Sequence, residues 1–305
     1  MKTYRTILLV SLMLLLTICC CTSSSPENEL REELQESYDH FLSALESENE
    51  ERIKSTMSSN VYAKNKNDFA NLKASFTSEM KKTAKFMPKI SKLSFVKVAH
   101  EGATAALIYS KDTKESYQPG PNITFILIKF VNSGSGWKYS GLYSETSSKY
   151  NANGSVKQLN LSSLAPEYAI DGKIEPTPPL LPEAEVVGFL HLISLGYKVE
   201  VVINNRKQAI INNSTLGAYV KGGLKFGENT LEIKCEKSVS KNNKLNLNAA
   251  MSDEEKAMYK QMHKRMFEKI ELTIKAKREQ KDEEVFKYKP GLKIEGTYTY
   301  TFKVL

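Results

Sequence analysis

The spacing of apolar residues along the first half of this chain changes at Pro88. Before Pro88, apolar residues recur every three or four positions, which is typical of amphipathic helices. After it, apolar and polar residues alternate, which is typical of strands with one buried face. Because proline lacks an N–H and clashes with the preceding turn, it ends a helix here. The chain is therefore expected to place helices before a sheet and to form an α+β layer packing.

Three helices are expected before Pro88. Ser25 and Pro26 suit the N-cap and the first position of the first helix. Asp39 and His40 lie well away from the apolar stripe of that helix, so they should face water. The expected apolar positions are Leu30, Leu34, Tyr38, Phe41, Leu42 and Leu45 in the first helix, Ile53 and Met57 in a short second helix, and Phe69, Leu72, Phe76 and Met80 in the third.

Four strands should follow, at residues 93–100, 103–110, 123–131 and 137–144. Glu101-Gly102 and the run at residues 132–136 have turn chemistry. Consecutive strands joined in this way predict a four-stranded antiparallel meander over this part of the chain.

Helix, short helix, helix and then strands ending in Gly136-Trp137-Lys138-Tyr139 is an order that resembles the NTF2-like superfamily. That resemblance covers residues 26–150 and implies a curved sheet wrapped round a helix. Bacterial lipoprotein members of the superfamily often end on such a Gly-Trp-Lys strand. The resemblance also implies a homodimer through the sheet. Tyr38, Tyr109, Trp137 and Tyr139 are candidates to line a pocket in the cone, and ordinary core packing is the alternative.

Residues 151–182 are expected to connect two domains, because they are rich in Asn, Ser and Pro. Their four closely spaced prolines favour a stiff, extended chain. Leu161, Leu164, Tyr168 and Ile170 are apolar, so part of the connector is expected to lie along one domain as an edge strand.

Residues 183–305 are expected to form an all-β sandwich with one inserted helix. The expected strands are 186–192, 198–203, 208–211, 216–220, 230–235, 270–277 and 297–304. Asn204 to Lys207 suits a hairpin turn. The phrase LKFGENTLEI, residues 224–233, resembles a stretch of many immunoglobulin-like and jelly-roll modules. It places Leu231 and Ile233 in the core.

The inserted helix is expected at residues 252–267, with Ser252 as its N-cap. Met258, Met262 and Met266 recur every four residues and form one stripe. This stripe either packs on the sandwich or is a docking surface, because methionine adapts to varied partners. The run 277–284 alternates in charge sign and predicts a solvated hairpin tip.

The N-terminus predicts export. Lys2 and Arg5 precede an apolar stretch at residues 7–18, which is too short to span the roughly 30 Å of a bilayer's hydrocarbon core. The run from Leu16 to Cys19 resembles a bacterial lipobox, which implies a signal peptide at 1–18 and a lipidated tether at 19–25. Cys19 would carry the lipid, with Cys20 and Cys21 as alternatives. The expected location is the cell envelope, facing the periplasm or the exterior, and an ordinary secretory signal is the alternative.

Cys235 is the single cysteine after that tether, so no disulfide framework holds the folded part together. It lies on the same side of an alternating strand as Leu231 and Ile233. Since buried thiols behave as small apolar side chains, we expect Cys235 to be packed rather than reactive.

Charge and motifs argue against several functions. The net charge of +8 falls to +6 without Lys2 and Arg5, and no basic block of the nucleic-acid type appears. Phosphate loops, paired metal ligands and nucleophile motifs are also absent, so no metal or cofactor is expected. The acids of the strand region, Glu101, Asp112, Glu115 and Glu145, lie at strand ends or in turns.

The sequence therefore predicts a lipid-anchored, non-catalytic binding or accessory protein. Its partner would be a protein or an apolar small molecule. The alternatives are an enzyme that uses the cone pocket and a structural protein whose sandwich recognises glycan or peptide.

Overall fold

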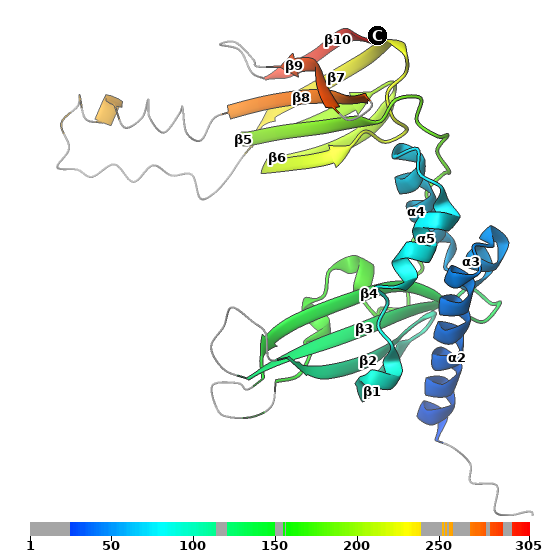
Figure 1. Ribbon diagram of the computed structural model, residues 1–305. Coiled ribbons are helices and arrows are strands. Elements are labelled where there is room, and N and C mark those ends of the chain that lie inside the picture. Colours follow the sequence, from blue (N-terminus) through cyan, green and yellow to red (C-terminus); the bar gives the residue numbers. More distant parts are fainter. Residues whose placement is uncertain are drawn as a thin grey trace, which may run out of the picture. The chain divides into compact units, whose positions relative to one another are not determined.

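The computed structural model describes residues 25–113, 121–149, 155, 157–238, 252, 254, 256–258, 269–278, 281–288 and 295–305. The chain divides into two compact units (Figure 1). The first unit contains the described residues up to 61 and from 83 to 176, and the second contains 62–82 and the described residues from 177 onward. Helices and antiparallel sheets confirm an α+β chain with a strand-rich second part. The packing assigns residues 62–82 to the second unit, whereas the sequence placed them inside a domain at 26–150.

The first unit opens with helix α2, Pro26–Glu46, and the short helix α3, Glu50–Thr56. Pro26 occupies the first turn of α2 and the Ser25 hydroxyl accepts a hydrogen bond from the Asn28 N–H, as predicted. Asp39 and His40 are exposed, which confirms that they face water. The buried face of α2 consists of Leu34, Tyr38, Phe41, Ala44 and Leu45.

The prediction of a single third helix is wrong. The structure has two helices there, α4 at Ser59–Asn71 and α5 at Phe76–Ala84, followed by a 3₁₀ turn at Ile90–Lys92. The chain turns at Lys73, which has a positive φ of 54°, and the Ala74 N–H closes the turn on the Phe69 carbonyl at 2.9 Å. This break brings the Phe76 ring against the edges of Tyr62 and Phe69. Packing of these rings offsets the cost of a left-handed lysine.

The first sheet is the predicted antiparallel meander. Its strands are β1 (Ser94–Glu101), β2 (Thr104–Thr113), β3 (Asn122–Asn132) and β4 (Trp137–Ser148), in that order across the sheet. Residues 122–131 of β3 are all buried, so both faces of the sheet are covered. Helix α2 covers one face, where Phe41 stacks on Tyr139 of β4 with ring centroids 4.0 Å apart.

The predicted connector covers the other face. Its residues Leu159, Leu161, Leu164 and Ile170 pack against the apolar cluster formed by Ala106, Ile108, Ile123, Phe125 and Leu127. The expected edge strand is wrong, because residues 161–168 form two 3₁₀ turns, Leu161–Ser163 and Pro166–Tyr168. The Lys129 ammonium, buried in β3, donates to the Glu167 carbonyl at 3.0 Å. The connector therefore covers the sheet face opposite α2.

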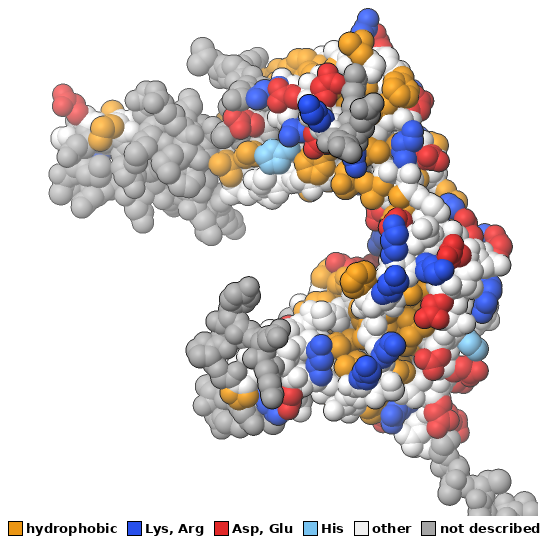
Figure 2. Space-filling model, viewed as in Figure 1, with side chains coloured by type: hydrophobic (Ala, Val, Ile, Leu, Met, Phe, Trp, Pro, Cys, Tyr) orange, Lys and Arg blue, Asp and Glu red, His pale blue; other side chains and the backbone are white. Residues whose placement is uncertain are grey.

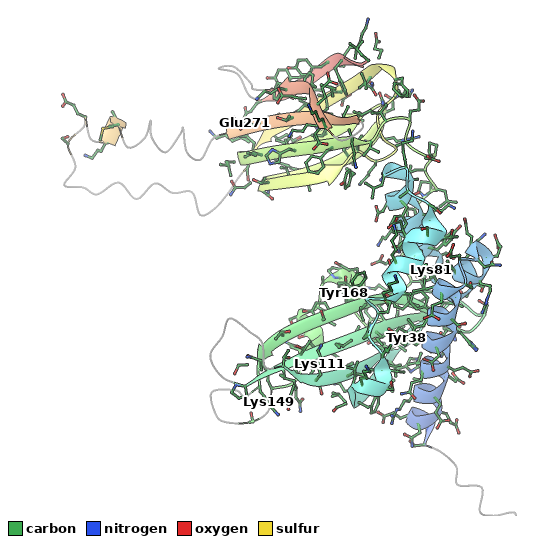
Figure 3. All side chains as sticks on the ribbon, viewed as in Figure 1. Tyr38, Lys81, Lys111, Lys149, Tyr168 and Glu271 are labelled. Carbon is green, nitrogen blue, oxygen red and sulfur yellow. The ribbon has the colours of Figure 1, made fainter. Side chains whose placement is uncertain are left out.

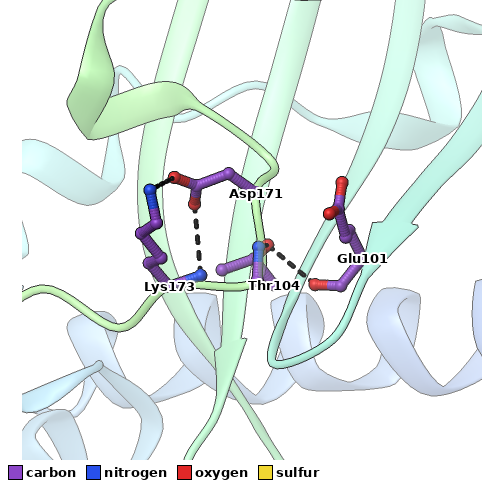
Figure 4. Close-up of polar contacts among 5 residues, drawn as sticks. Glu101, Thr104, Asp171 and Lys173 are labelled. Carbon is purple, nitrogen blue, oxygen red and sulfur yellow. Dashed lines mark hydrogen bonds and ion pairs between the residues drawn. The ribbon is translucent and has the colours of Figure 1, made fainter.

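A small polar cluster fastens the end of this cover to the β1–β2 turn (Figure 4). The buried Thr104 hydroxyl donates to the Glu101 carbonyl at 3.1 Å and accepts from the Gly172 N–H at 2.9 Å. Beside it, the Lys173 N–H donates to the Asp171 carboxylate at 3.1 Å and lowers the pKa of that carboxyl. These short contacts hold residues 171–173 against the sheet.

The second unit contains one six-stranded antiparallel sheet. Its strands are β5 (Gly188–Ile203), β6 (Arg206–Tyr219), β7 (Gly227–Lys237), β8 (Lys269–Arg278), β9 (Lys281–Tyr288) and β10 (Gly296–Val304). The order is β10-β7-β5-β8-β9, with β6 paired to β5. Two predicted pairs of short strands are single long strands, β5 and β6, and part of the predicted hairpin tip is strand β9.

A bulge in β5 gives this sheet a sandwich-like form. Residues 188–195 of β5 pair with β8, whereas residues 197–203 pair with β7. Between them, Gly196 has a φ of 79°, its N–H donates to the Asn213 side chain at 3.0 Å, and the Ser194 hydroxyl donates to the Tyr197 carbonyl at 2.6 Å. Strands β9 and β10 stand at opposite ends of the strand order, yet the ring of Phe286 in β9 contacts the ring of Tyr300 in β10 at a centroid distance of 5.4 Å. The sheet therefore folds back on itself.

Two local predictions in this unit are confirmed. Asn204 and Asn205 have φ values of 49° and 62°, the left-handed pair that a tight hairpin turn requires, and they join β5 to β6. Cys235 is buried with Leu231 and Ile233 in the core. Burial raises the pKa of the Cys235 thiol to about 11, so the thiol stays protonated and unreactive near neutral pH.

Candidate functional site

Three of the four expected pocket residues are packed into the core of the first unit. The Tyr38 hydroxyl donates to the Pro88 carbonyl at 3.0 Å, and the side chain lies between α2 and the sheet (Figure 3). The Tyr109 hydroxyl accepts from the Gln35 amide at 2.9 Å. Tyr139 is covered by the stacked ring of Phe41. Burial raises the pKa of all three tyrosines, so their hydroxyls stay protonated and neutral near neutral pH.

Trp137 has a different place, on a groove of about 550 Å³ between α2, α3 and the β3–β4 turn. The Ser37 hydroxyl donates to the Trp137 carbonyl at 2.8 Å, and the His100 ring meets the indole edge-on at 5.6 Å. The other groove residues include Glu33, Glu36 and His40, all exposed. This groove is polar, and neither Tyr38 nor Tyr109 lines it.

Of the acids expected at strand ends or in turns, Glu101 and Asp112 lie near strand ends, Glu145 lies within β4, and Glu115 is outside the described residues. Asp112 pairs with Lys149 at 2.8 Å near the end of β2, and Glu145 accepts from the Tyr143 hydroxyl at 3.1 Å. His100 is exposed at the end of β1. Among the described residues, no group of three His, Cys, Asp or Glu side chains could hold a metal ion. On the face seen in Figure 2, cationic and acidic side chains of this unit are interspersed.

The candidate site is a cavity of about 660 Å³ in the second unit. This volume lies in the range of small-molecule sites. We call it the α4–β6 cavity. Its lining is Lys64, Asn67, Asp68 and Asn71 from α4, Pro178, Pro179 and Leu181 from the proline-rich segment, Arg206 and Lys207 from the start of β6, and Lys221 from the turn after β6.

Two asparagines of α4 assemble the cavity from segments far apart in the sequence. The buried Asn67 side chain donates to the Pro179 carbonyl at 3.0 Å and accepts from the Leu181 N–H at 2.7 Å. One helical turn later, the Asn71 side-chain oxygen accepts from the Gly222 N–H at 2.6 Å. Because proline fixes φ, the segment at residues 178–181 stays extended and forms one wall of the cavity.

A third buried amide, that of Gln208, positions Arg206 at the start of β6 and Lys221 in the turn after it. Its nitrogen donates to the Arg206 carbonyl at 3.0 Å and its oxygen accepts from the Lys221 N–H at 2.7 Å. The Arg206 guanidinium lies against the Cα of Gly222, where any Cβ would collide with it, and Gly222 has a φ of 76°. Glycine is therefore favoured there by the backbone conformation, and a larger residue would also displace the Arg206 guanidinium.

The charged side chains around the α4–β6 cavity are mostly basic, although most of its accessible lining is apolar. One carboxylate, that of Asp68, lines the cavity together with four cationic side chains, those of Lys64, Arg206, Lys207 and Lys221. Lys207 is neutralised by Glu200, which lies 2.7 Å from its ammonium. Burial raises the pKa of Asp68, and the nearby Lys221 and Lys64 oppose that rise. The cavity thus presents hydrogen-bond donors and positive charge beside an apolar wall of proline and leucine.

Comparison with known protein families, with curated proteins and with solved structures found no match. None of the helices described is long and apolar enough to cross a membrane. Cys19, Cys20, Cys21, Met262 and Met266 lie outside the described residues. Met258 of the expected docking stripe is exposed.

The sequence analysis did not find the α4–β6 cavity, although its parts leave a signal. Asn67 and Asn71 are spaced by one helical turn, so they share one face of α4. Pro178-Pro179 and Arg206-Lys207 are unusual local pairs. Nothing in the sequence shows that these three segments meet, because their contacts span more than a hundred residues.

Proposed function

We propose that this chain is a lipid-anchored, non-catalytic binding protein of the cell envelope, whose α4–β6 cavity holds a small molecule. The observation that carries the proposal is the cavity itself. Buried side-chain amides fix its walls, and it combines a few polar groups with an apolar surface. This combination is typical of preformed small-molecule sites.

The first unit would then be an NTF2-like module that serves as a scaffold. A long helix packed on a four-stranded antiparallel sheet supports this assignment. The interior tyrosines are buried in packing contacts, and the hydroxyls of Tyr38 and Tyr109 are hydrogen-bonded. Both observations favour binding elsewhere in the chain over acid–base chemistry in a cone.

The proposed anchor is a diacylglycerol thioether on Cys19, or on Cys20 or Cys21. Each buried methylene of an acyl chain contributes roughly 0.8 kcal/mol, so several chains hold a protein at a membrane. Mass spectrometry of the mature N-terminal peptide tests this directly. A lipidated cysteine at the new N-terminus supports the anchor, whereas an unmodified peptide starting at Thr22 or later contradicts it.

The binding role is tested by thermal unfolding of the full chain in detergent against a panel of neutral, cationic and anionic small molecules. Leu181→Trp fills the cavity, and Leu180→Trp is the matched control, because Leu180 is 56% exposed beside it. We expect at least one compound to raise the unfolding temperature of the parent chain and of the control, but not of Leu181→Trp. A panel without hits, or hits that Leu181→Trp retains, would reject the cavity as the binding site.

A further inference from the structure

We infer that the α4–β6 cavity takes a small organic phosphate, with the phosphate group on Arg206, Lys221 and Asn71 and a ring-sized apolar body on the proline wall. This inference rests on the proposed binding function and adds the chemical class of the ligand.

The first reason is charge that the protein does not neutralise. Within the described part of the chain, no carboxylate pairs with the Arg206 guanidinium, although that side chain is half-buried. Lys221 and Lys64 share the single carboxylate of Asp68. Lys64 and Lys221 are exposed and Arg206 is half-buried. Like charges held near one another repel, and a bound anion would relieve that repulsion.

The second reason is the orientation of the Asn71 amide. Its side chain is only 5% exposed, and its oxygen is occupied by the Gly222 N–H at 2.6 Å. The remaining end is therefore the NH₂ group, which can only donate. No described residue accepts from this group, and Asn71 lines the cavity. An unpartnered donor that opens onto the cavity can be satisfied by a ligand or by water.

The third reason is that the convergent groups are donors of the kind that bind phosphate. The guanidinium of Arg206 offers a planar fork that matches two phosphate oxygens, and Lys221 adds a point charge. Three donor groups and two full charges suit a dianionic phosphate better than a neutral ligand. The framework that holds the two cations is rigid, because Gln208 binds the backbone of both residues.

The apolar wall selects the rest of the molecule. Pro178, Pro179 and Leu181 line the side contributed by the proline-rich segment. A cavity of about 660 Å³ is far larger than inorganic phosphate requires and accommodates an attached ring. The ligand is therefore expected to bind through both ends, with the phosphate group fixing its orientation.

Asp68 opposes the ligand in this arrangement. Its carboxylate faces Lys221 and Lys64, the same cations that an incoming phosphate would use, with Arg206 and Lys207 on the facing strand. Replacing Asp68 with asparagine removes one negative charge and keeps the side-chain volume. The Asp68→Asn variant should therefore bind the phosphate more tightly, and this gain cannot arise from misfolding.

The test is titration calorimetry of the full chain in detergent with phenyl phosphate, and with phenol and inorganic phosphate as matched probes. We expect phenyl phosphate to bind at least tenfold more tightly than either fragment. Arg206→Gln and Lys221→Gln should each weaken it about tenfold or more, and Asp68→Asn should strengthen it severalfold. Lys234→Gln, which removes the same charge from an exposed site on β7, should change the affinity less than twofold.

Three results would overturn the inference. Phenol binding as tightly as phenyl phosphate would show an apolar site and would leave the proposed function standing. Equal affinities for phenyl phosphate and inorganic phosphate would show that the apolar wall of Pro178, Pro179 and Leu181 does not contribute to binding. Arg206→Gln and Lys221→Gln behaving like Lys234→Gln would show that phosphate binds elsewhere. Failure of the proposed function gives a different result. In that case no compound of the broad panel raises the unfolding temperature of the parent chain while failing to raise that of Leu181→Trp.

Discussion

Asn229 gives the sharpest prediction about the stability of the second unit. Its side chain is 0% exposed, at the start of β7. Its oxygen accepts from the Lys225 N–H at 2.9 Å and from the Asn204 amide at 2.8 Å. Its nitrogen donates to the carbonyls of Lys225 at 2.9 Å and Gly227 at 3.1 Å. One amide thus joins the β5–β6 turn to the loop before β7.

The expected cost of Asn229→Ala follows from the groups that it leaves behind. Four groups lose their partner. The half-buried Asn204 amide can turn to water, which leaves three backbone groups, the N–H and carbonyl of Lys225 and the carbonyl of Gly227. At about 1 kcal/mol for each, the free energy of unfolding should fall by about 3 kcal/mol.

Asn229→Asp separates this hydrogen-bond network from side-chain volume. The carboxylate keeps the acceptor role of the native oxygen but places negative charge against two carbonyl oxygens. Burial and these carbonyls should raise the pKa of the new carboxyl in the folded state above its unfolded value of about 3.9. The destabilisation is therefore fully present above the folded-state pKa and declines as pH falls through it. At neutral pH we expect a loss at least as large as that of Asn229→Ala.

Urea unfolding followed by circular dichroism measures these losses, and Asn212→Ala, on the exposed part of β6, is the matched control. Trp137 is the single tryptophan and belongs to the first unit, so its fluorescence reports on that unit and should keep its midpoint in the variants. A loss below about 1 kcal/mol for Asn229→Ala would refute the reasoning, because it is less than the expected sum. An Asn229→Asp protein as stable as the parent at pH 7 would refute it equally.

Three further predictions concern single buried side chains. Tyr38→Phe removes the hydrogen bond to the Pro88 carbonyl and should lower the stability of the first unit by about 1 kcal/mol, seen as an earlier tryptophan fluorescence midpoint in urea. Phe41→Ala removes the ring stacked on Tyr139 and should cost about 3–5 kcal/mol in the same assay, so a loss below that of Tyr38→Phe would contradict the packing described. Burial raises the pKa of Cys235 to about 11, so above pH 9 the unfolded chain releases a thiol proton that the folded chain keeps, and stability falls between pH 9 and 11. Cys235→Ala should show a shallower fall over that range, and identical slopes would refute this source of alkaline sensitivity.

Local structure was largely predictable from the sequence, because local interactions create it. The start of α2 follows from Ser25 and Pro26, whose side chain and ring act on the next turn of the backbone. The β5–β6 turn follows from two asparagines, which tolerate a positive φ. Cys235 is buried because alternation along one strand places it with its apolar neighbours.

Breaks within elements were not predictable. A helical pattern continues through Lys73, and only the packing of three aromatic rings explains why the helix ends before it. The strand pattern around Gly196 gave two strands, whereas the structure has one strand that changes its partner at a bulge. In both places tertiary contacts decide between local conformations of similar energy.

The candidate site belongs wholly to tertiary structure. By itself, the sequence determined which segments are helices and strands, where the main turns lie and which faces are apolar, since these depend on neighbours a few residues apart. Only the folded chain decided that residues 62–82 pack with the second unit, and that Asn71 meets Gly222 across 151 positions of sequence. The physical reason is that a hydrogen bond between distant segments leaves no periodicity or spacing in either of them, so the basic α4–β6 cavity exists only once both segments are in place.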